Sequence, residues 1–299
     1  MAIQKLAHAE IKVDDMEKAL QYNVELFGLR EIARTGNAVY LGCGLDNNYD
    51  LALVPGGTGI SHFAYQVASD DDLQGYKKRI EQYGINVEER TDAEPGQQKS
   101  IGFDLPGTHQ TIRMELVTVE DRPQYLHPAL SPNRQLQGAA PIDLDHVTLM
   151  VANANQLADF LKSTMDFKIS DIFQPAPGIW GSVWSRATEH HHDLAFMAGR
   201  NPNETLNHIA FSFEGLDHMK RALDMLAKHD LKLEFGLGRH GIGGNLYAYY
   251  WAPGGNRYEL TAEMPRVVDD KAEPVIWEDL YKGISAWGMP MVDSLGIGS

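Results

Sequence analysis

The chain has 299 residues, of which 43% are hydrophobic and 22% are charged, a profile typical of globular proteins that argues against extensive disorder. Its 26 basic and 41 acidic residues give a net charge of −15 without a basic stripe, which argues against nucleic-acid binding, and no apolar run is long enough for a membrane span. The lone cysteine, Cys43, excludes a disulfide framework and a thiolate metal cage, and with no secretory signal in MAIQKLAHAEIKV it predicts a cytoplasmic protein.

The first predicted elements along the chain form two similar units. A strand that alternates polar and apolar residues (6–13, LAHAEIKV) precedes a helix with apolar residues at helical spacing, which ends at Gly28. A second alternating strand (61–67, SHFAYQV) precedes another helix, whose apolar face is marked by Leu73, Tyr76, Ile80 and Tyr83. Because β-rich segments with turn residues follow each helix, we predict two strand–helix–strands units, at about 5–58 and 60–120.

Residues 121–142 are predicted to be a linker, because they contain four prolines: Pro123, Pro128, Pro132 and Pro141. The second half then repeats the first in the same order: LDHVTLMV matches LAHAEIKV, HDLAFM matches YDLALV, NHIAFSF matches SHFAYQV, and APGGNRYELT matches LPGTHQTIRMELV. Ordered self-similarity of this kind indicates a duplicated domain. The predicted organisation is a first domain at 1–120, the linker, a second domain at 143–265, and a tail at 266–299 that packs near the site of the second domain.

Polar residues at repeat-matched positions of the second half form a candidate metal centre. His146 and His208 lie near the start of corresponding strands, and Glu259 lies in the last strand of the fourth unit. A carboxylate in an apolar hairpin is costly unless a partner compensates its charge. Two imidazoles and one carboxylate leave coordination positions open, which suits a non-haem Fe(II) that holds a substrate and O2 together. The alternative is that each histidine is a hydrogen-bonded structural residue of its strand.

The stretch from Gly238 to Glu259, GRHGIGGNLYAYYWAPGGNRYE, carries the most specific motif: Gly-x-His, a spacer, an aliphatic residue and Tyr, then a small residue, Pro-x-Gly and Glu. In these residues the chain resembles the type I extradiol catechol dioxygenases of the vicinal-oxygen-chelate superfamily, and the resemblance extends over nearly its whole length. Ala248 departs from the pattern, which usually has a larger aliphatic residue there. The resemblance implies an α+β fold of two tandem domains, each a pair of βαβββ modules that form an incomplete barrel-like sheet around a metal cavity.

The resemblance also implies roles for individual residues. The ligands of Fe(II), or alternatively of Mn(II), would be His146, His208 and Glu259. His192 would be the acid–base residue, His240 would line the pocket, and Tyr249 would hydrogen-bond the substrate or an intermediate. The implied activity is cleavage of a catechol ring next to its two hydroxyls, with O2 as co-substrate, by a homo-oligomer that is often a tetramer.

Aromatic residues of the second half are candidates for the substrate pocket. Trp184, Trp180 and Phe173 are expected to surround an aromatic ring in an apolar cavity, and Trp184 falls where some family members have a pocket tryptophan. Members that take acid-bearing catechols tend to place an arginine shortly before the position of His240. Here only Arg239 is nearby, on the opposite face of a strand, which favours a neutral catechol, alkylated or chlorinated.

The run His190-His191-His192 is interpreted from strand alternation. His190 and His192 are expected to share a face while His191 points away, and a solvated polar edge is the alternative interpretation for His190 and His191. The position of His192 just before DLAF singles it out, because this position is repeated in the first half, where Tyr49 stands before DLAL.

The first half keeps a matching set of candidate ligands, His8, His62 and Glu115. It has no counterpart of His192, His240 or Tyr249, and Gly102 stands in the place that aligns with Tyr249. We therefore expect a catalytically silent first domain, and the sequence leaves open whether that domain binds a second metal.

Two other functions are compatible with the same superfamily. The first is an isomerase or lyase of the glyoxalase type that uses a different divalent metal, and the second is a non-enzymatic protein that binds aromatic compounds or drugs. Neither explains why two histidines and a tyrosine, at 192, 240 and 249, would accompany the candidate ligands.

Overall fold

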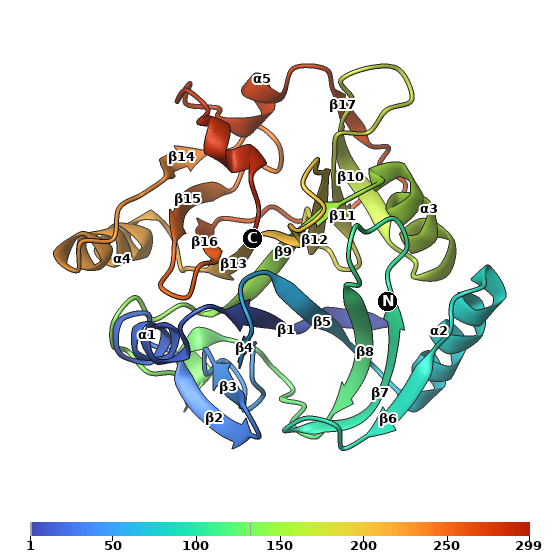
Figure 1. Ribbon diagram of the computed structural model, residues 1–299, viewed down its shortest axis with the longest axis horizontal. Helices are drawn as coiled ribbons and strands as arrows, with labels where there is room; N and C mark the ends of the chain where they lie inside the picture. Colours follow the sequence, from blue (N-terminus) through green and yellow to red (C-terminus); the bar gives the residue numbers. More distant parts are fainter. Residues whose placement is uncertain (1, 132) are drawn as a thin grey trace.

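A computed structural model describes residues 2–131 and 133–299, which form two curled sheets, one from each half of the chain. In Figure 1 the first half, blue to green, lies below the second half, yellow to red. The strands of the first sheet are β1 (Ile3–Val13), β2 (Arg30–Thr35), β3 (Ala38–Gly42), β4 (Leu51–Pro55), β5 (Ile60–Val67), β6 (Glu88–Thr91), β7 (Gln97–Asp104) and β8 (Arg113–Val119). Those of the second are β9 (Asp143–Val151), β10 (Lys168–Phe173), β11 (Ser182–Arg186), β12 (Leu194–Ala198), β13 (Leu206–Ser212), β14 (Phe235–Arg239), β15 (Leu246–Trp251), β16 (Arg257–Ala262) and β17 (Val275–Trp277).

Each sheet is built from two βαβββ modules joined through their first strands. In the first sheet the strand order is β2-β3-β4-β1-β5-β8-β7-β6, so the antiparallel pair β1 and β5 joins the modules at the centre. The second sheet repeats this order, with β9 and β13 at its centre and β17 added at the edge beside β10. The architecture is therefore the duplicated α+β fold that the sequence predicts, and its centre brings the first strands of neighbouring modules side by side.

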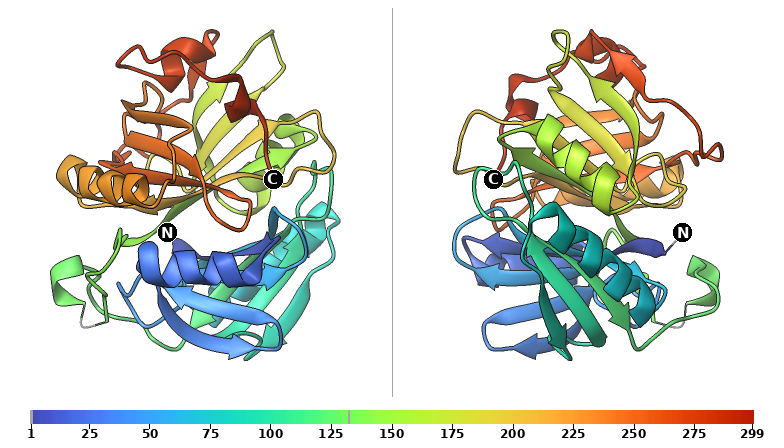
Figure 2. Two further views of the ribbon diagram at one scale, coloured as in Figure 1. Left: turned by 60° about the vertical axis from the view of Figure 1, so that its left-hand side comes forward. Right: turned by 90° about the vertical axis from the view of Figure 1, so that its right-hand side faces the viewer.

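One helix follows the first strand of each module: α1 (Met16–Gln21), α2 (Asp70–Tyr83), α3 (Ala154–Thr164) and α4 (Leu216–Lys228). Side chains cap the start of most of these helices, as when Ser69 accepts a hydrogen bond from the backbone N–H of Asp72. Gly84 ends α2 with a φ of 97°, a left-handed conformation that glycine adopts without a steric penalty. Helices α2 and α3 come from different halves and lie side by side (Figures 1 and 2).

The first helix differs from the regular helix that the sequence predicts up to Gly28. The α-helix ends at Gln21, and residues Tyr22–Leu26 continue it as a π-helix, in which Phe27 N–H donates to the carbonyl of Tyr22 at 2.8 Å. The side chain of Asn23 donates to the carbonyl of Ala19 at 2.8 Å and so competes with the backbone hydrogen bonds of this turn. Apolar spacing alone does not distinguish a π-turn from an α-turn.

This π-turn carries polar contacts between the two halves of the chain. The hydroxyls of Tyr22 and Tyr250 lie 2.5 Å apart, and Tyr258 donates to Oδ1 of Asn23 at 3.1 Å, all in buried surroundings. At another point of the interface, Lys5 Nζ lies 2.9 Å from both carboxylate oxygens of Asp143. Buried polar groups that are paired in this way fix the orientation of the halves, because separating them would leave the groups without partners.

The linker and the tail both pack on the domains. Residues 121–142 contain a short 3-10 helix, η2 (Pro128–Leu130), while Pro132 lies outside the described residues, as does Met1. After β17, the tail continues through the short helix α5 (Leu280–Ile284) and a 3-10 turn, η3 (Asp293–Gly296), over the second sheet (Figure 1). The boundaries of the domains at 120, 143 and 265 stay a prediction from the sequence.

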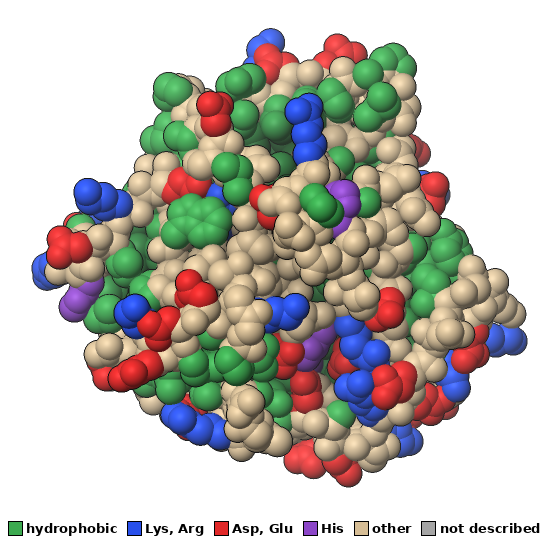
Figure 3. Space-filling model, viewed as in Figure 1, with side chains coloured by type: hydrophobic (Ala, Val, Ile, Leu, Met, Phe, Trp, Pro, Cys, Tyr) green, Lys and Arg blue, Asp and Glu red, His purple; other side chains and the backbone are tan. Residues whose placement is uncertain are grey.

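Charged groups of both signs are scattered over the face of the molecule seen in Figure 3. On this face, Lys and Arg side chains are interspersed with Asp and Glu over both halves. Among the helices of the described chain, none has the length and apolar character needed to cross a lipid bilayer.

Substitution of Asn23 by Ala tests whether the polar contacts of the π-turn hold the two halves of the chain together. The buried hydroxyl of Tyr258 would lose its acceptor, so we expect a loss of about 1–3 kcal/mol in the free energy of unfolding, measured by denaturant titration. The matched control is Gln21→Ala at an exposed position of the same helix, which should stay within about 0.5 kcal/mol of the wild type. Equal stability of Asn23→Ala and the wild type would show that this contact does not hold the halves together.

Candidate active site

Three neighbouring strands of the second sheet bring His146, His208 and Glu259 together. His146 is on β9, His208 on β13 and Glu259 on β16, and β13 lies between the other two strands. The register places Ala210 of β13 opposite both His146 and Glu259. Oε2 of Glu259 lies 3.1 Å from Nε2 of each histidine, and the two Nε2 atoms are 3.4 Å apart. These residues could therefore offer three donor atoms to a single cation.

Neighbouring side chains fix the tautomer of both histidines. Nδ1 of His146 lies 2.8 Å from Oδ1 of Asp145, and Nδ1 of His208 lies 2.7 Å from Oδ1 of Asn207. Since a carboxylate and an amide oxygen can only accept, each Nδ1 carries the proton and donates it to this bond. In a neutral imidazole each Nε2 then keeps its lone pair directed at Glu259, which is the arrangement that metal-binding histidines require.

The carboxylate of Glu259 is buried without full compensation. The residue is 1% exposed, and within the described residues its Oε1 has no hydrogen-bond partner. Burial opposes its ionisation, but His146 and His208 outweigh burial and hold the carboxyl pKa well below its ordinary value. Burial lowers the pKa of His146, while Glu259 and Asp145 raise it to about 9. In the absence of metal the cluster therefore shares a proton, and a divalent cation can replace that proton because metal ligands must be deprotonated.

A cavity of about 120 Å³ opens beside this cluster. Strands β11 and β12 form one wall, with Val183 and Phe196 among its apolar residues, and the tail closes another wall. The tail residues that contribute are Leu280, Ile284, Met291, Leu295 and Gly296. The described residues that line the cavity include four histidines, Tyr249 and Glu259 but no Lys or Arg. The cavity is thus apolar apart from one patch of proton-carrying and metal-binding groups, as small-molecule sites commonly are.

His192, His240 and Tyr249 all lie on this patch, beside the three candidate ligands. The ring of His192 lies 4.3 Å from that of His146, centroid to centroid. His240 lies in the turn that follows β14, where its Nδ1 is 2.6 Å from the carbonyl of Ile284, so Nδ1 donates and Nε2 accepts. The hydroxyl of Tyr249 is 2.9 Å from that Nε2 and therefore donates to it.

The structure adds three residues that the sequence did not identify as part of the site. His191 is buried, and its Nδ1 lies 3.0 Å from Nδ1 of His192. Nε2 of His191 contacts Asp171, whose other oxygen accepts a hydrogen bond from Nε1 of Trp277 at 2.5 Å. The alternative of a solvated polar edge is wrong for His191, which is buried, and its contact with His192 departs from strand alternation because residues 190–193 precede β12. The run of three consecutive histidines was the only sequence signal for His191, and it could not identify Asp171 and Trp277, which come from distant strands.

Of the three aromatic residues predicted to line the substrate pocket, one borders the cavity and two lie elsewhere. Trp184 borders the cavity. Trp180 instead packs on the edge of the hydrophobic core. Phe173 ends β10, which is separated from the ligand-bearing strand β9 by β11 and β12, and it lies against Gly181, away from the cavity. Arg239 also lies outside the lining, where it donates to Glu263 at 2.6 Å.

Two family models match the chain. Residues 60–118 match the catechol 2,3-dioxygenase-like N-terminal domain, and residues 143–260 match the glyoxalase/bleomycin resistance protein/dioxygenase superfamily. The second range contains all three candidate ligands, and the two ranges together make up more than half of the chain.

Curated relatives are similar over almost the whole chain. A manganese-dependent 2,3-dihydroxybiphenyl 1,2-dioxygenase from Geobacillus genomosp. 3 is 28% identical, over 97% of this chain and 95% of the relative. A metapyrocatechase from Geobacillus stearothermophilus is 27% identical, over 92% of this chain and 86% of the relative.

Solved structures share the fold. A variant of homoprotocatechuate 2,3-dioxygenase from Brevibacterium fuscum superposes with a TM-score of 0.85 at 22% identity, over 98% of this chain and 81% of that chain. A 2,3-dioxygenase from a Pseudomonas species gives a TM-score of 0.83 at 21% identity, over 93% of this chain and 98% of that chain. The chain therefore contains a domain of the glyoxalase/bleomycin resistance protein/dioxygenase superfamily at residues 143–260, preceded by a catechol 2,3-dioxygenase-like N-terminal domain at residues 60–118.

Proposed function

We propose that the protein is an extradiol catechol dioxygenase, which inserts both atoms of O2 into a catechol next to its two hydroxyls and releases a muconic semialdehyde-type product. The observation that carries this proposal is the buried Glu259 carboxylate with an unpaired oxygen, held between two histidines at the wall of an apolar cavity. The curated relatives named as an extradiol dioxygenase and as metapyrocatechases support the same reaction class.

His146, His208 and Glu259 would hold the metal ion through one face. A bound divalent iron or manganese ion supplies adjacent open positions for the catechol oxygens and O2, and it acidifies a bound hydroxyl. Relatives are named as manganese-dependent and as iron-dependent, so both metals fit the proposal. The protein's own contribution is to keep both imidazoles in the tautomer that leaves Nε2 free, through Asp145 and Asn207.

His192 is the proposed acid–base residue. Burial, together with the neighbouring histidines, holds its pKa well below the ordinary value, so the ring is neutral near pH 7 and able to accept a proton. The Asp171 carboxylate accepts from Nε2 of His191, which leaves Nδ1 of His191 as an acceptor for Nδ1–H of His192. Nε2 of His192 then carries the lone pair, and this tautomer suits it to take the catechol proton and return it.

Tyr249 and His240 are proposed to stabilise the oxygens of the substrate and of the opened ring. Burial lowers the pKa of His240, which favours its neutral form as the acceptor of the Tyr249 hydroxyl proton. A substrate oxygen that enters the cavity can compete for the Tyr249 hydroxyl, because both groups line the same wall. A donor that is already placed where negative charge develops costs little reorganisation during the reaction.

The substrate class that best fits the cavity is a neutral catechol with one ring, alkylated or chlorinated. The volume of the cavity, about 120 Å³, is comparable with the volume of about 150 Å³ of an engineered protein cavity that binds benzene. Among the described lining residues there is no cation that would pair with a carboxylate substituent, and Arg239 is engaged by Glu263.

We further propose a cytoplasmic homo-oligomer, with a tetramer as the first assembly to test. The linker exposes four large apolar side chains, Tyr125, Leu126, Leu130 and Leu136, and surfaces of this kind are commonly buried between subunits. Light scattering on the purified protein measures the assembly. The single cysteine, Cys43, supports a reducing compartment.

Activity on a panel of catechols tests the proposal. Protein stripped of metal and reloaded anaerobically with Fe(II) or Mn(II) should consume one O2 per neutral catechol and form a yellow ring-opened semialdehyde. Carboxylated catechols should react at least about tenfold less efficiently in kcat/KM, because a charge enters an apolar cavity without a partner. Absence of O2 uptake with every catechol and either metal would overturn the dioxygenase assignment.

The metal content of the His146→Ala variant distinguishes a metal-dependent dioxygenase from a binding protein that needs no metal. The second domain should lose its iron and the activity together, while a matched change at the surface histidine His229→Ala should leave both unchanged. Unchanged iron in the second domain of His146→Ala would mean that the ligand assignment is wrong.

Asp171→Asn tests the hydrogen-bond chain behind His192. An asparagine can still accept from Trp277, but its amide would donate to His191 and reverse the tautomer that orients His192. We expect kcat to fall by about 10–100-fold, with KM for the catechol and the metal content unchanged. Asp270→Asn, which removes an exposed ion pair with Lys168, is the control. A kcat equal to wild type would show that Asp171 does not act on the reaction.

A further inference from the structure

The first domain contains a second cluster of metal-binding side chains in the same place in its fold. His8 is on β1, His62 on β5 and Glu115 on β8, and the register places Ala64 of β5 opposite both His8 and Glu115. His8 is 2% exposed and His62 is 8% exposed, and their Nε2 atoms face each other at 3.3 Å. The duplication has thus kept the pair of facing imidazoles in a domain that lacks the other groups of the active site.

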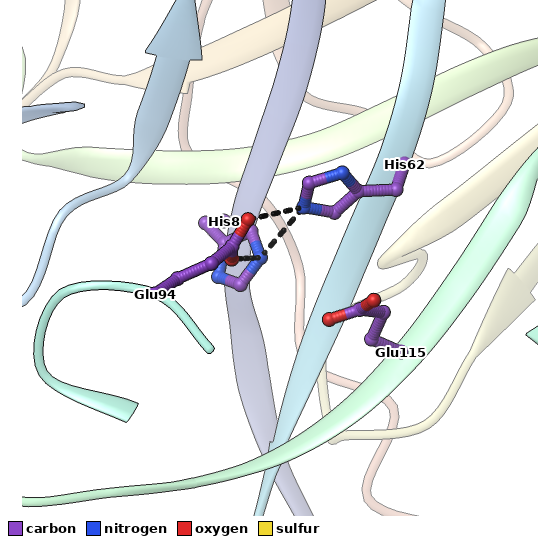
Figure 4. Close-up of side chains that lie close together, drawn as sticks. All are labelled: His8, His62, Glu94 and Glu115. Carbon is purple, nitrogen blue, oxygen red and sulfur yellow. Dashed lines mark hydrogen bonds and ion pairs between the residues drawn. The ribbon is translucent and has the colours of Figure 1, made fainter. Parts of the chain in front are cut away.

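A carboxylate that has no equivalent in the second domain enters this cluster. Glu94 lies in the loop between β6 and β7, where its Oε2 is 3.4 Å from Nε2 of His8 and its Oε1 is 3.4 Å from Nε2 of His62 (Figure 4). Pro95 and Gly96 form the turn that presents it, with Gly96 at a φ of 77° and the N–H of Gln97 donating to the carbonyl of Glu94 at 3.1 Å. The corresponding loop of the second domain, between β14 and β15, carries His240.

Glu115, the repeat equivalent of Glu259, is already paired. Its Oε1 accepts from Nε of Arg113 at 2.8 Å and lies 3.9 Å from Arg90. In the second domain the matching arginine, Arg257, turns to Glu234 instead, at 2.6 Å, and leaves Glu259 uncompensated. In Figure 4 Glu115 points toward the cluster, but the dashed contacts join only the two histidines and Glu94.

Other groups hold the new carboxylate and one imidazole in place. Tyr49, at the position that matches His192, donates its hydroxyl to Oε2 of Glu94, and Nε2 of Gln97 donates to the same oxygen at 2.5 Å. Glu10 lies 3.4 Å from Nδ1 of His62, so that a carboxylate stands behind this histidine. Such outer partners are characteristic of metal-bound histidines and carboxylates.

We propose that His8, His62 and Glu94 form a second, non-catalytic metal site in the first domain, for a divalent cation such as Zn²⁺ that accepts two imidazoles and a carboxylate, with Glu94 as the carboxylate ligand because Glu115 is paired with Arg113. Ligand atoms about 2.0–2.1 Å from zinc are about 3.3–3.4 Å apart in a tetrahedron. The two imidazole Nε2 atoms, 3.3 Å apart, match this spacing, and each lies 3.4 Å from a different oxygen of the Glu94 carboxylate.

The surroundings explain why this site would bind a metal without catalysis. The adjoining cavity is about 10 Å³, room for about one water molecule as the fourth ligand, and it is lined by His8, Tyr49 and Gln97 among others. No aromatic ring fits there. Bound zinc would tie β1 and β5 to the loop before β7, so its function is to stabilise the first domain.

Zinc binding to a full-length variant with the second site removed tests the proposal. The double variant His146→Ala/His208→Ala is stripped with a chelator, dialysed against Zn²⁺ alone and measured by elemental mass spectrometry. We expect about one zinc ion per chain, retained with Glu115→Gln added and lost with Glu94→Gln added. Thermal melting of each variant with and without zinc checks that it is folded, and only proteins with the intact cluster should gain in melting temperature.

Two results would overturn the proposal. A folded double variant that takes up no zinc would show that the cluster is held by a proton, with a charged His62 between Glu10 and Glu94. Loss of zinc with Glu115→Gln but not with Glu94→Gln would show that the third ligand is wrong. The single variant Glu94→Gln should keep the ring-cleaving activity of the second domain, so failure here is distinguishable from failure of the proposed function.

Discussion

The burial of one carboxylate, Glu259, is the constraint on which the arrangement of the second domain depends. An isolated buried carboxylate would cost several kcal/mol, and the residue is 1% exposed with one oxygen unpaired among the described residues. Two imidazoles on adjacent strands face it, and each is held from behind so that its Nε2 points inward. Such a cluster is stable only with a cation at its centre, a proton in the free protein and a divalent metal when one is bound. Around the cluster of Glu259 and its two histidines lie the walls of the cavity, part of the tail and the hydrogen-bond chain behind His192.

The two domains place matching residues in different surroundings. Both sheets present two histidines and a glutamate in the same register. In the second domain Arg257 pairs with Glu234 and not with Glu259. In the first domain Arg113 pairs with Glu115, and Glu94 from a loop contacts the two facing imidazoles instead. The orientation of one arginine thus decides which carboxylate is free to bind a metal.

The sequence was sufficient for the duplicated fold and for grouping His146, His208 and Glu259, because these depend on the repeat, whereas His192, His240 and Tyr249 were expected only from the resemblance to the family. Matching strands in a duplicated sheet have matching registers, so aligned polar residues had to meet. It was not sufficient where a contact joins segments without a repeat relation. Glu94 comes from a loop whose counterpart carries a histidine, while the partners behind His191 are Asp171 on β10 and Trp277 on the added edge strand β17. Strand alternation failed for His191 because its segment is not a strand, and helical spacing could not reveal the π-turn at Tyr22–Leu26.

The most direct test of the central claim is a crystal structure of the metal-loaded protein, with anomalous diffraction recorded at the iron and manganese absorption edges. The account predicts a peak within about 2.5 Å of Nε2 of His146, Nε2 of His208 and a carboxylate oxygen of Glu259. A fully loaded, active protein with no anomalous peak at that point, or with the iron bound elsewhere, would contradict it.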